Sequence, residues 1–369
     1  MTTTIAVLCL LVPVVAVYAG VAGLLRWGRP VLVEDRPNAR SSHGAPVPRG
    51  GGLVIVTVVL GCFGLYQVSV GKLMDWRTFV IFTSGAGFVA LVSWLDDVHV
   101  LSNRARLVAQ VLAAMNAIAV FGYWHDVTFP IVGEVHLGMI GLPFTVLWVI
   151  GLANAFNFID GTDGMVATQA VAGGLWAAVI GFLLGAPVLS VLGLMMAGAC
   201  IGFLLHNWWP ARIFMGDVGS VFIGYVFAIL MVHAGRHDPV LVLAAGLLFG
   251  PVVLDTGVTF LRRALRGERV FESHRTHLYQ RLVATGESHR SVALLYAGFS
   301  VAFGLLAMLW LPRTAPSRPV VALMVVATFA FLLLLVHSAE RRAARRRPGP
   351  GSPETLRPEA VMTSHQAGH

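Results

Sequence analysis

The sequence predicts an all-α polytopic membrane protein with about eleven transmembrane helices. Three observations predict it: 57% of the 369 residues are hydrophobic, only 12% are charged, and the apolar residues fall into runs long enough to cross a bilayer. A soluble domain would carry roughly a quarter charged residues, and a disordered chain would be poor in apolar ones, so both classes are excluded. The three cysteines lack metal-ligand spacing and indicate neither a disulfide framework nor a zinc site.

The apolar runs place the helices in order along the chain. We expect them at residues 4–25, 52–71, 78–95, 105–123, 141–159, 165–185, 188–206, 218–234, 239–261, 291–311 and 319–337. The first run lacks the basic start and the cleavage site of a signal peptide, so we interpret it as a retained helix. Residues 124–137 (WHDVTFPIVGEVHL) alternate apolar and polar side chains around Gly133, which predicts a short β-hairpin on the exterior face.

The distribution of Lys and Arg predicts the orientation. Of the 26 such residues, 21 fall in the loops on one side or in the C-terminal tail, so the N-terminus is expected outside and the C-terminus in the cytoplasm. We divide the chain into one integral-membrane domain, 1–338, with its site in cytoplasmic loops, and a basic, disordered cytoplasmic tail, 339–369. The net charge of +8 follows from this bias, and no nucleic-acid partner is expected.

Unusual polar residues gather on the cytoplasmic side of this topology. They occur in RSSHGAPVPRGGG (40–52), SWLDD (93–97), NAFNFIDGTDG (154–164), FMGDVGS (214–220) and SHRTHLYQR (273–281). A site built from several loops at one face suits a water-soluble substrate that arrives from the cytosol. It fits poorly with a translocation path, which needs polar groups near mid-membrane.

Single motifs leave alternatives open. The pair Asp96 and Asp97 fits a solvated helix end, although acids at a helix C-terminus oppose the macrodipole and favour a nearby cation. Residues 49–52 (RGGG) fit a phosphate-binding turn or a glycine hinge. Asp255, on an apolar background in the ninth run, fits a lipid-head role or a structural pairing. No Walker or Rossmann motif occurs, so ATP-driven pumping and Rossmann redox chemistry lack support.

Taken together, the polar stretches form a set of oxygen donors, with several carboxylates, two asparagines and no cysteine. Such donors suit a hard cation such as Mg²⁺, which usually joins few protein carboxylates to substrate phosphates. The set therefore predicts Mg²⁺-dependent chemistry on a phosphate ester at the inner membrane face.

In this order, the five motifs resemble the polyprenyl-phosphate N-acetylhexosamine-1-phosphate transferases, the glycosyl transferase 4 family, from about residue 30 to 290. The resemblance implies transfer of a sugar 1-phosphate from a UDP-sugar to undecaprenyl phosphate in the bacterial inner membrane, with UMP as the second product. It implies the first membrane step of a surface polysaccharide.

Within the family, the first-loop motif and the HLYQRL sequence resemble the branch that initiates O-antigen. The adjacent histidines of the muramyl-pentapeptide branch are absent. We therefore expect UDP-GlcNAc as the donor, or a related sugar nucleotide such as UDP-FucNAc or UDP-QuiNAc, with UDP-MurNAc-pentapeptide as the weaker alternative.

The resemblance also implies a role for each matching residue. Asp217 and Asn157 would hold Mg²⁺, for which Mn²⁺ can substitute. Substrate-binding roles fall on Arg40, His43, Asn154, Asp160, Asp163 and Phe214, and the ring of the last would stack on uracil. Catalytic roles fall on Asp96, Asp97, His274, Arg275 and His277. Direct attack by the lipid phosphate is preferred over a phospho-enzyme, and the choice stays open.

Two other classes compete with a transferase. A lipid-linked-sugar transporter would need a polar path, and only Asp255 and scattered polar residues within the spans could line one. A non-catalytic scaffold is expected to lose some of the acids, and none is missing here. The expected partners are the UDP-N-acetylhexosamine, undecaprenyl phosphate and the lipid bilayer, and a homodimer is left open.

Overall fold

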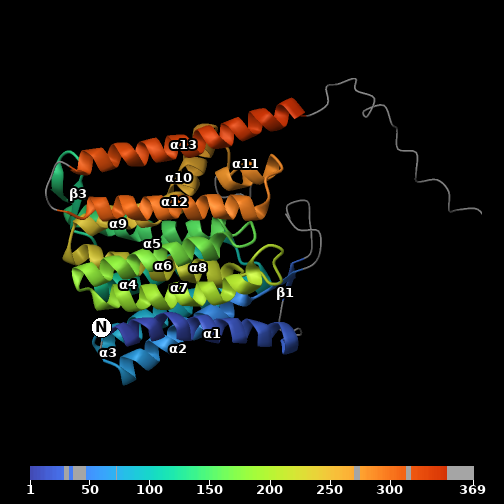
Figure 1. The fold of residues 1–369 in the computed structure, drawn as a ribbon. Helices are drawn as coiled ribbons and strands as arrows, with labels where there is room; N and C mark the ends of the chain where they lie inside the picture. Colours follow the sequence, from blue (N-terminus) through green and yellow to red (C-terminus); the bar gives the residue numbers. More distant parts are fainter. Residues whose placement is uncertain (29–32, 36–46, 72, 270–274, 313–316, 347–369) are drawn as a thin grey trace, which may run out of the picture.

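The structure is a computed structural model of the chain, and it describes residues 1–28, 33–35, 47–71, 73–269, 275–312 and 317–346. Within them, 10 helices are long and apolar enough to cross a membrane, or 11 spans if one sharply bent pair counts as one. The helices pack side by side in one bundle (Figure 1). The predicted all-α polytopic membrane fold is therefore confirmed.

The helices follow the predicted order closely. They are α1 (Thr3–Trp27), α2 (Gly51–Ser69), α3 (Trp76–His99), α4 (Asn103–Phe121), α5 (Gly141–Phe158), α6 (Met165–Leu184), α7 (Pro187–Asn207), α8 (Asp217–His237), α9 (Val240–Leu248), α10 (Gly250–Leu265), α11 (Leu278–Ala284), α12 (His289–Trp310) and α13 (Ser317–Arg346). The strands are β1 (Val33–Asp35), β2 (Val47–Arg49), β3 (Asp126–Phe129) and β4 (Gly133–His136), and a 3-10 turn, Gly138–Ile140, precedes α5.

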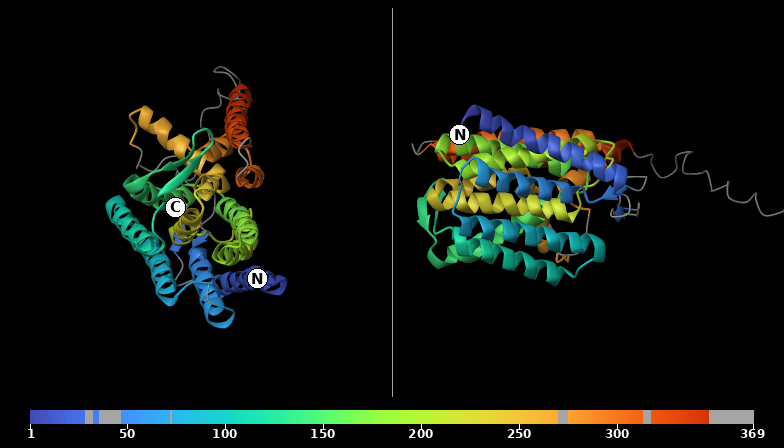
Figure 2. Two further views of the ribbon diagram at one scale, coloured as in Figure 1. Left: turned by 90° about the vertical axis from the view of Figure 1, so that its left-hand side faces the viewer. Right: turned by 90° about the horizontal axis from the view of Figure 1, so that it is seen from below.

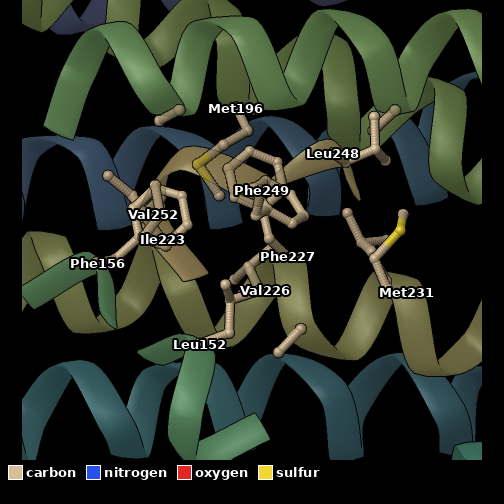
Figure 3. Close-up of a cluster of buried hydrophobic side chains, with 14 of the residues drawn as sticks. Leu152, Phe156, Met196, Ile223, Val226, Phe227, Met231, Leu248, Phe249 and Val252 are labelled. Carbon is tan, nitrogen blue, oxygen red and sulfur yellow. The ribbon is translucent and has the colours of Figure 1, made fainter. Parts of the chain in front are cut away.

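Helix α8 forms the centre of the bundle. In its most apolar stretch 94% of the residues are buried, against 22% in α1. Figure 3 shows part of this core, where the Phe227 ring of α8 packs between Phe156 of α5 and Phe249, with ring centroids 5.9 and 4.9 Å apart. Because a close-packed interior resists displacement, the start of α8 is a firm base for a site.

The ninth expected span, 239–261, is not one continuous helix, and that part of the prediction is wrong. Helices α9 and α10 meet at an angle of 82°. Pro251 lies in the first turn of α10 and has no amide hydrogen with which to continue α9. The Phe249 ring is buried in the core at the break. Helix α10 therefore leans away from the other helices (Figure 2) and exposes Phe260 and Leu261.

Two hairpins connect spans at opposite ends of the bundle. Strands β3 and β4 pair in antiparallel fashion, which confirms the hairpin expected at 124–137. Val127 of β3 is fully buried, and the Thr128 amide donates to the Pro239 carbonyl oxygen at 3.3 Å. Strands β1 and β2 form a second antiparallel hairpin, which the sequence pattern does not reveal.

The ends of the helices define two faces. Figure 1 places β1 and the ends of α1 and α13 at one end of the bundle, and the chain's start and β3 at the other. The two ends of the described chain therefore lie on opposite faces. Helix α13 continues past the domain boundary expected at 338. Beyond that boundary, Ala339 is buried and Glu340 pairs with Arg281. The rest of the expected tail, 347–369, lies outside the described residues.

Candidate active site

The polar stretches meet at the end of the bundle where α3, α5 and α7 finish and α8 begins. Ten of the thirteen predicted site residues fall in the described part of the chain. Arg40, His43 and His274 lie outside the described residues. The acids and asparagines among the others form one acidic centre, described below from its base at α8 outward, and Phe214, Arg275 and His277 lie on the loops before α8 and α11.

Asp97 caps the start of α8. Its two carboxylate oxygens accept hydrogen bonds from the backbone amides of Asp217 and Val218, each at 3.1 Å. These amides belong to the first turn of α8, where no carbonyl within the helix can accept them and where the helix dipole is positive. Gly216 makes the contact feasible, because a Cβ there would lie 2.8 Å from an Asp97 oxygen.

Asp96 turns the other way, toward α4. One oxygen accepts from the Leu101 amide at 2.6 Å, and the other pairs with the Arg106 guanidinium at 2.9 Å. The same guanidinium nitrogen lies 3.8 Å from an Asp217 oxygen. The acidic pair at the end of α3 therefore has the cationic neighbours that the macrodipole argument requires: the α8 N-terminus for one acid and Arg106 for the other.

A pocket of about 360 Å³, its open mouth included, lies between α3, α4, α5 and α8. Its polar wall consists of Ser93, Asp96, Arg106, Gln110, Asn154, Asn157 and Asp217. Asn157 lies beside Asp217 in this wall, and its amide side chain stabilises the Asp217 carboxylate. Asn154 is already paired, because its Nδ2 donates to Gln110 at 2.7 Å and its Oδ1 accepts from Gln110 at 3.4 Å. The structure thus brings both predicted metal ligands to one wall of the pocket.

Asp160 lies on the loop between α5 and α6. Burial, together with the charges of Asp217 and Asp97, raises its pKa to about 7, and the Arg49 guanidinium opposes the shift. Arg49 therefore lies close to this acidic centre, on strand β2. The part of the shift that comes from Asp217 and Asp97 reflects neighbouring negative charge, which an added cation would relieve.

Asp163 connects the α5–α6 loop to neighbouring segments. One oxygen accepts from the Ala211 amide at 3.0 Å, and the other lies 3.5 Å from Nδ1 of His289. Its neighbour in the chain, Gly164, donates to the Asn207 side chain at 2.9 Å. These contacts join the α5–α6 loop to the α7–α8 loop and to the start of α12. The predicted nucleotide contact of Asp163 stays a prediction.

The glycine-rich run packs the first loop onto α8. The Phe214 amide donates to the Pro48 carbonyl oxygen at 2.9 Å, and the Phe214 carbonyl accepts from the Gly51 amide at 3.1 Å. A Cβ on Gly52 would lie 2.4 Å from the Gly219 backbone. Close approach of α2 to α8 thus explains these glycines, rather than a phosphate turn or a hinge. The Phe214 side chain remains partly exposed beside the site.

The last motif lies on the loop that leads into α11. His277 is 4% exposed, and its Nδ1 lies 3.3 Å from Asp255, whereas Arg275 is exposed. The Tyr279 hydroxyl donates to the Phe158 carbonyl oxygen at 3.0 Å. Helix α11 is therefore attached to the end of α5, next to the acidic loop.

Sequence reasoning missed two cations of the site. Arg106 counted only toward orientation, and Arg49 only toward orientation and as the first residue of the 49–52 turn, although each lies among the acids. Arg106 lies in the helix that follows the acidic pair, and Arg49 directly precedes the glycine run. Their closeness in sequence to these two motifs was the signal that could have identified them.

The pocket offers few protein ligands to a metal ion. Among the residues that the structure describes, no group of three or more His, Cys, Asp or Glu could hold an ion. Asp217 and Asn157 nevertheless present one carboxylate and one amide to the same pocket. This fits Mg²⁺, which takes one or two carboxylates from the protein and further oxygens from water and substrate phosphates.

Comparison with known proteins agrees with this geometry. The family described as "Glycosyl transferase family 4" matches residues 79–235, which include the acidic pair, the α5–α6 loop and the start of α8. The chain is 33% identical over 270 residues to a Bacillus subtilis protein, covering 71% of this chain and 73% of the relative. That relative is named probable undecaprenyl-phosphate N-acetylglucosaminyl 1-phosphate transferase.

Two further relatives match over most of their length. The decaprenyl-phosphate N-acetylglucosaminephosphotransferase of Mycobacterium tuberculosis is 29% identical over 335 residues, 82% of each chain. The phospho-N-acetylmuramoyl-pentapeptide-transferase of Symbiobacterium thermophilum is 31% identical over 309 residues, 80% of this chain and 90% of the relative. The chain therefore belongs to glycosyl transferase family 4 and is a membrane-embedded transferase.

Proposed function

We propose that the chain transfers N-acetylglucosamine 1-phosphate from UDP-GlcNAc to undecaprenyl phosphate, with Mg²⁺, at the cytoplasmic face of the bacterial inner membrane. The observation that carries the proposal is the pocket that joins Asp96, Arg106, Asn157 and Asp217 at the capped start of α8. The names of the relatives supply the lipid phosphate and the sugar. The excess of Arg in the loops of this face supports its cytoplasmic position.

In the proposed reaction, an oxygen of the lipid phosphate forms a bond to the β-phosphorus of the UDP-sugar. The bond from that phosphorus to the bridging oxygen breaks, and UMP leaves with the electron pair. Asp217 and Asn157 would hold Mg²⁺, which supplies positive charge for the diphosphate oxygens. Arg106 and Arg49 add cationic groups on either side, so the chain's main task is to align two anions.

The structure supports direct attack over a phospho-enzyme. Hydrogen-bond donors lower the nucleophilicity of a carboxylate oxygen, and both oxygens of Asp97 accept backbone amides. Both oxygens of Asp96 are engaged as well, by Leu101 and Arg106. A phosphate monoester is itself a competent nucleophile at neutral pH, so a covalent relay is not required.

A UMP-release assay tests the proposal. Purified protein, undecaprenyl phosphate and Mg²⁺ are combined with UDP-GlcNAc, UDP-GalNAc, UDP-FucNAc, UDP-QuiNAc or UDP-MurNAc-pentapeptide, each with and without EDTA. We expect EDTA-sensitive UMP from UDP-GlcNAc. Release of UMP from UDP-MurNAc-pentapeptide alone would overturn the assignment of GlcNAc as the sugar. If folded protein released no UMP from any donor, the proposed reaction itself would be overturned. The polysaccharide that follows, O-antigen or another surface polymer, is part of the proposal.

Phe214→Ala is expected to raise KM for the UDP-sugar about tenfold with a smaller change in kcat, because base–aromatic stacking contributes roughly 1–3 kcal/mol. The backbone of Phe214 is held by Pro48 and Gly51, so truncation leaves the loop in place. Phe182→Ala, an exposed ring in α6 away from the site, is the control. An unchanged KM in the Phe214 variant would remove the stacking role.

A further inference from the structure

Asp255 is a carboxylate with no access to solvent. It lies in α10, just after the break in the ninth span, and its exposed fraction is 0%. A lipid headgroup therefore cannot reach it, and of the two roles that the sequence left open, the structure supports pairing. A buried carboxylate is costly unless its oxygens are satisfied by hydrogen bonds.

Five donors surround the two oxygens of Asp255. The backbone amides of Leu278 and Tyr279 donate at 2.8 and 3.1 Å. The Tyr296 hydroxyl of α12 donates at 2.5 Å, and the Thr259 hydroxyl, one turn along α10, donates at 3.3 Å. His277 contributes its Nδ1 at 3.3 Å. Three of these donors come from the start of α11, so Asp255 acts as its cap from another helix.

Helix α11 depends on such contacts. It has 7 residues, too few for a helix that is stable by itself. Its Tyr279 hydroxyl bonds the end of α5, and a Cβ on Gly161 would lie 2.2 Å from that hydroxyl. A displacement of α11 would therefore reach the end of α5, which carries Asn157, and the following loop, which carries Asp160.

We propose that Asp255, supported by Tyr296, is a positioning residue of the transferase: it holds α11 and the His277 ring against the acidic loop. The contact with Asp255 fixes the Nδ1 side of the His277 ring. The break at Pro251 turns α10 away from the direction of α9. The Asp255 carboxylate of α10 thereby reaches α11 and α12. This inference rests on the proposed function for its kinetic part only.

The test compares Asp255→Asn and Tyr296→Phe with the parent protein in the same detergent. An asparagine keeps one acceptor oxygen, so one of the two α11 amides loses its partner. We expect faster hydrogen exchange confined to residues 277–284, and kcat/KM for the UDP-sugar lower by about ten- to a hundredfold. KM for the lipid phosphate and the melting temperature of the bundle should change little. Tyr296→Phe removes only one hydroxyl and should show the same pattern more weakly.

Glu340→Gln is the matched control. The Arg281–Glu340 pair holds α11 from its other side, with both N–O distances at 2.8 Å, but both side chains are partly exposed. Glu340→Gln removes the charge of this pair but leaves the buried contacts of Asp255 with the start of α11 in place, so activity should stay near that of the parent protein.

Two results would overturn the inference. One is unchanged exchange at 277–284 in both Asp255→Asn and Tyr296→Phe. The other is a loss of activity that merely follows a general rise in exchange through α5, α6 and α8. If the parent protein turns over no donor, the proposed function fails, whereas the exchange comparison still decides whether Asp255 positions α11.

Discussion

Asp217→Asn is expected to reduce turnover by about a thousandfold or more, even at high Mg²⁺, because it removes the carboxylate on which charge stabilisation of the diphosphate depends. Asp217 is the acidic group that joins the pocket, Asn157 and Arg106. Its backbone amide is capped by Asp97, and an asparagine leaves that contact intact. The fold should therefore survive, and UMP release across a Mg²⁺ titration measures the loss.

The matched control is Asp238→Asn, the same change just past the other end of α8. It should leave kcat unchanged. A second measurement follows thermal unfolding: Mg²⁺ together with UDP-GlcNAc should stabilise the parent protein and Asp238→Asn, but not Asp217→Asn. Parent-like turnover in Asp217→Asn would remove this residue as the metal ligand.

Asp97→Asn is expected to lower kcat with the lipid acceptor by about a hundredfold. The carboxylate accepts both amides of the first α8 turn, whereas an amide side chain offers one oxygen and turns a donor toward the other N–H. The start of α8, and Asp217 with it, should move relative to the pocket. Steady-state kinetics with varied undecaprenyl phosphate measure the change.

Asp75→Asn supplies the control for this prediction. Asp75 caps the other end of the same α3 helix by accepting from the Thr78 amide at 3.0 Å. Loss of charge at an ordinary helix cap costs at most about 1 kcal/mol, so stability should fall slightly and kcat should not change. If both variants kept the parent kcat, Asp97 would have no role beyond an ordinary cap.

The spans could be predicted from hydropathy, because ten of them are continuous apolar helices whose composition carries the signal. The break in the ninth span could not be predicted, since both halves of the span are apolar and only Gly250 and Pro251 mark the bend. The β1–β2 hairpin also escaped prediction, because its three-residue strands pair with little periodic pattern.

The site was predictable in its location more than in its contacts. The motifs placed Asn157 and Asp217 on one face, and the structure brings them to one pocket. The motifs did not show that Asp163 connects two loops by a hydrogen bond or that Asn154 pairs with Gln110. Each of these partners comes from a different helix or loop, and a side chain's hydrogen-bond partner depends on packing rather than on its own motif.

The sequence by itself determined that the chain crosses a membrane and that its acids gather at one end, because hydropathy and the order of motifs are local properties of the chain. Only the tertiary structure decided what each acid does. Asp97 meets the amide of a residue 120 positions away, and Asp255 meets α11 after a bend between α9 and α10 that hydropathy does not record. Such contacts arise when α3 packs on α8 and when α10 leaves the bundle. Burial then makes the loss of a hydrogen-bond partner costly in free energy.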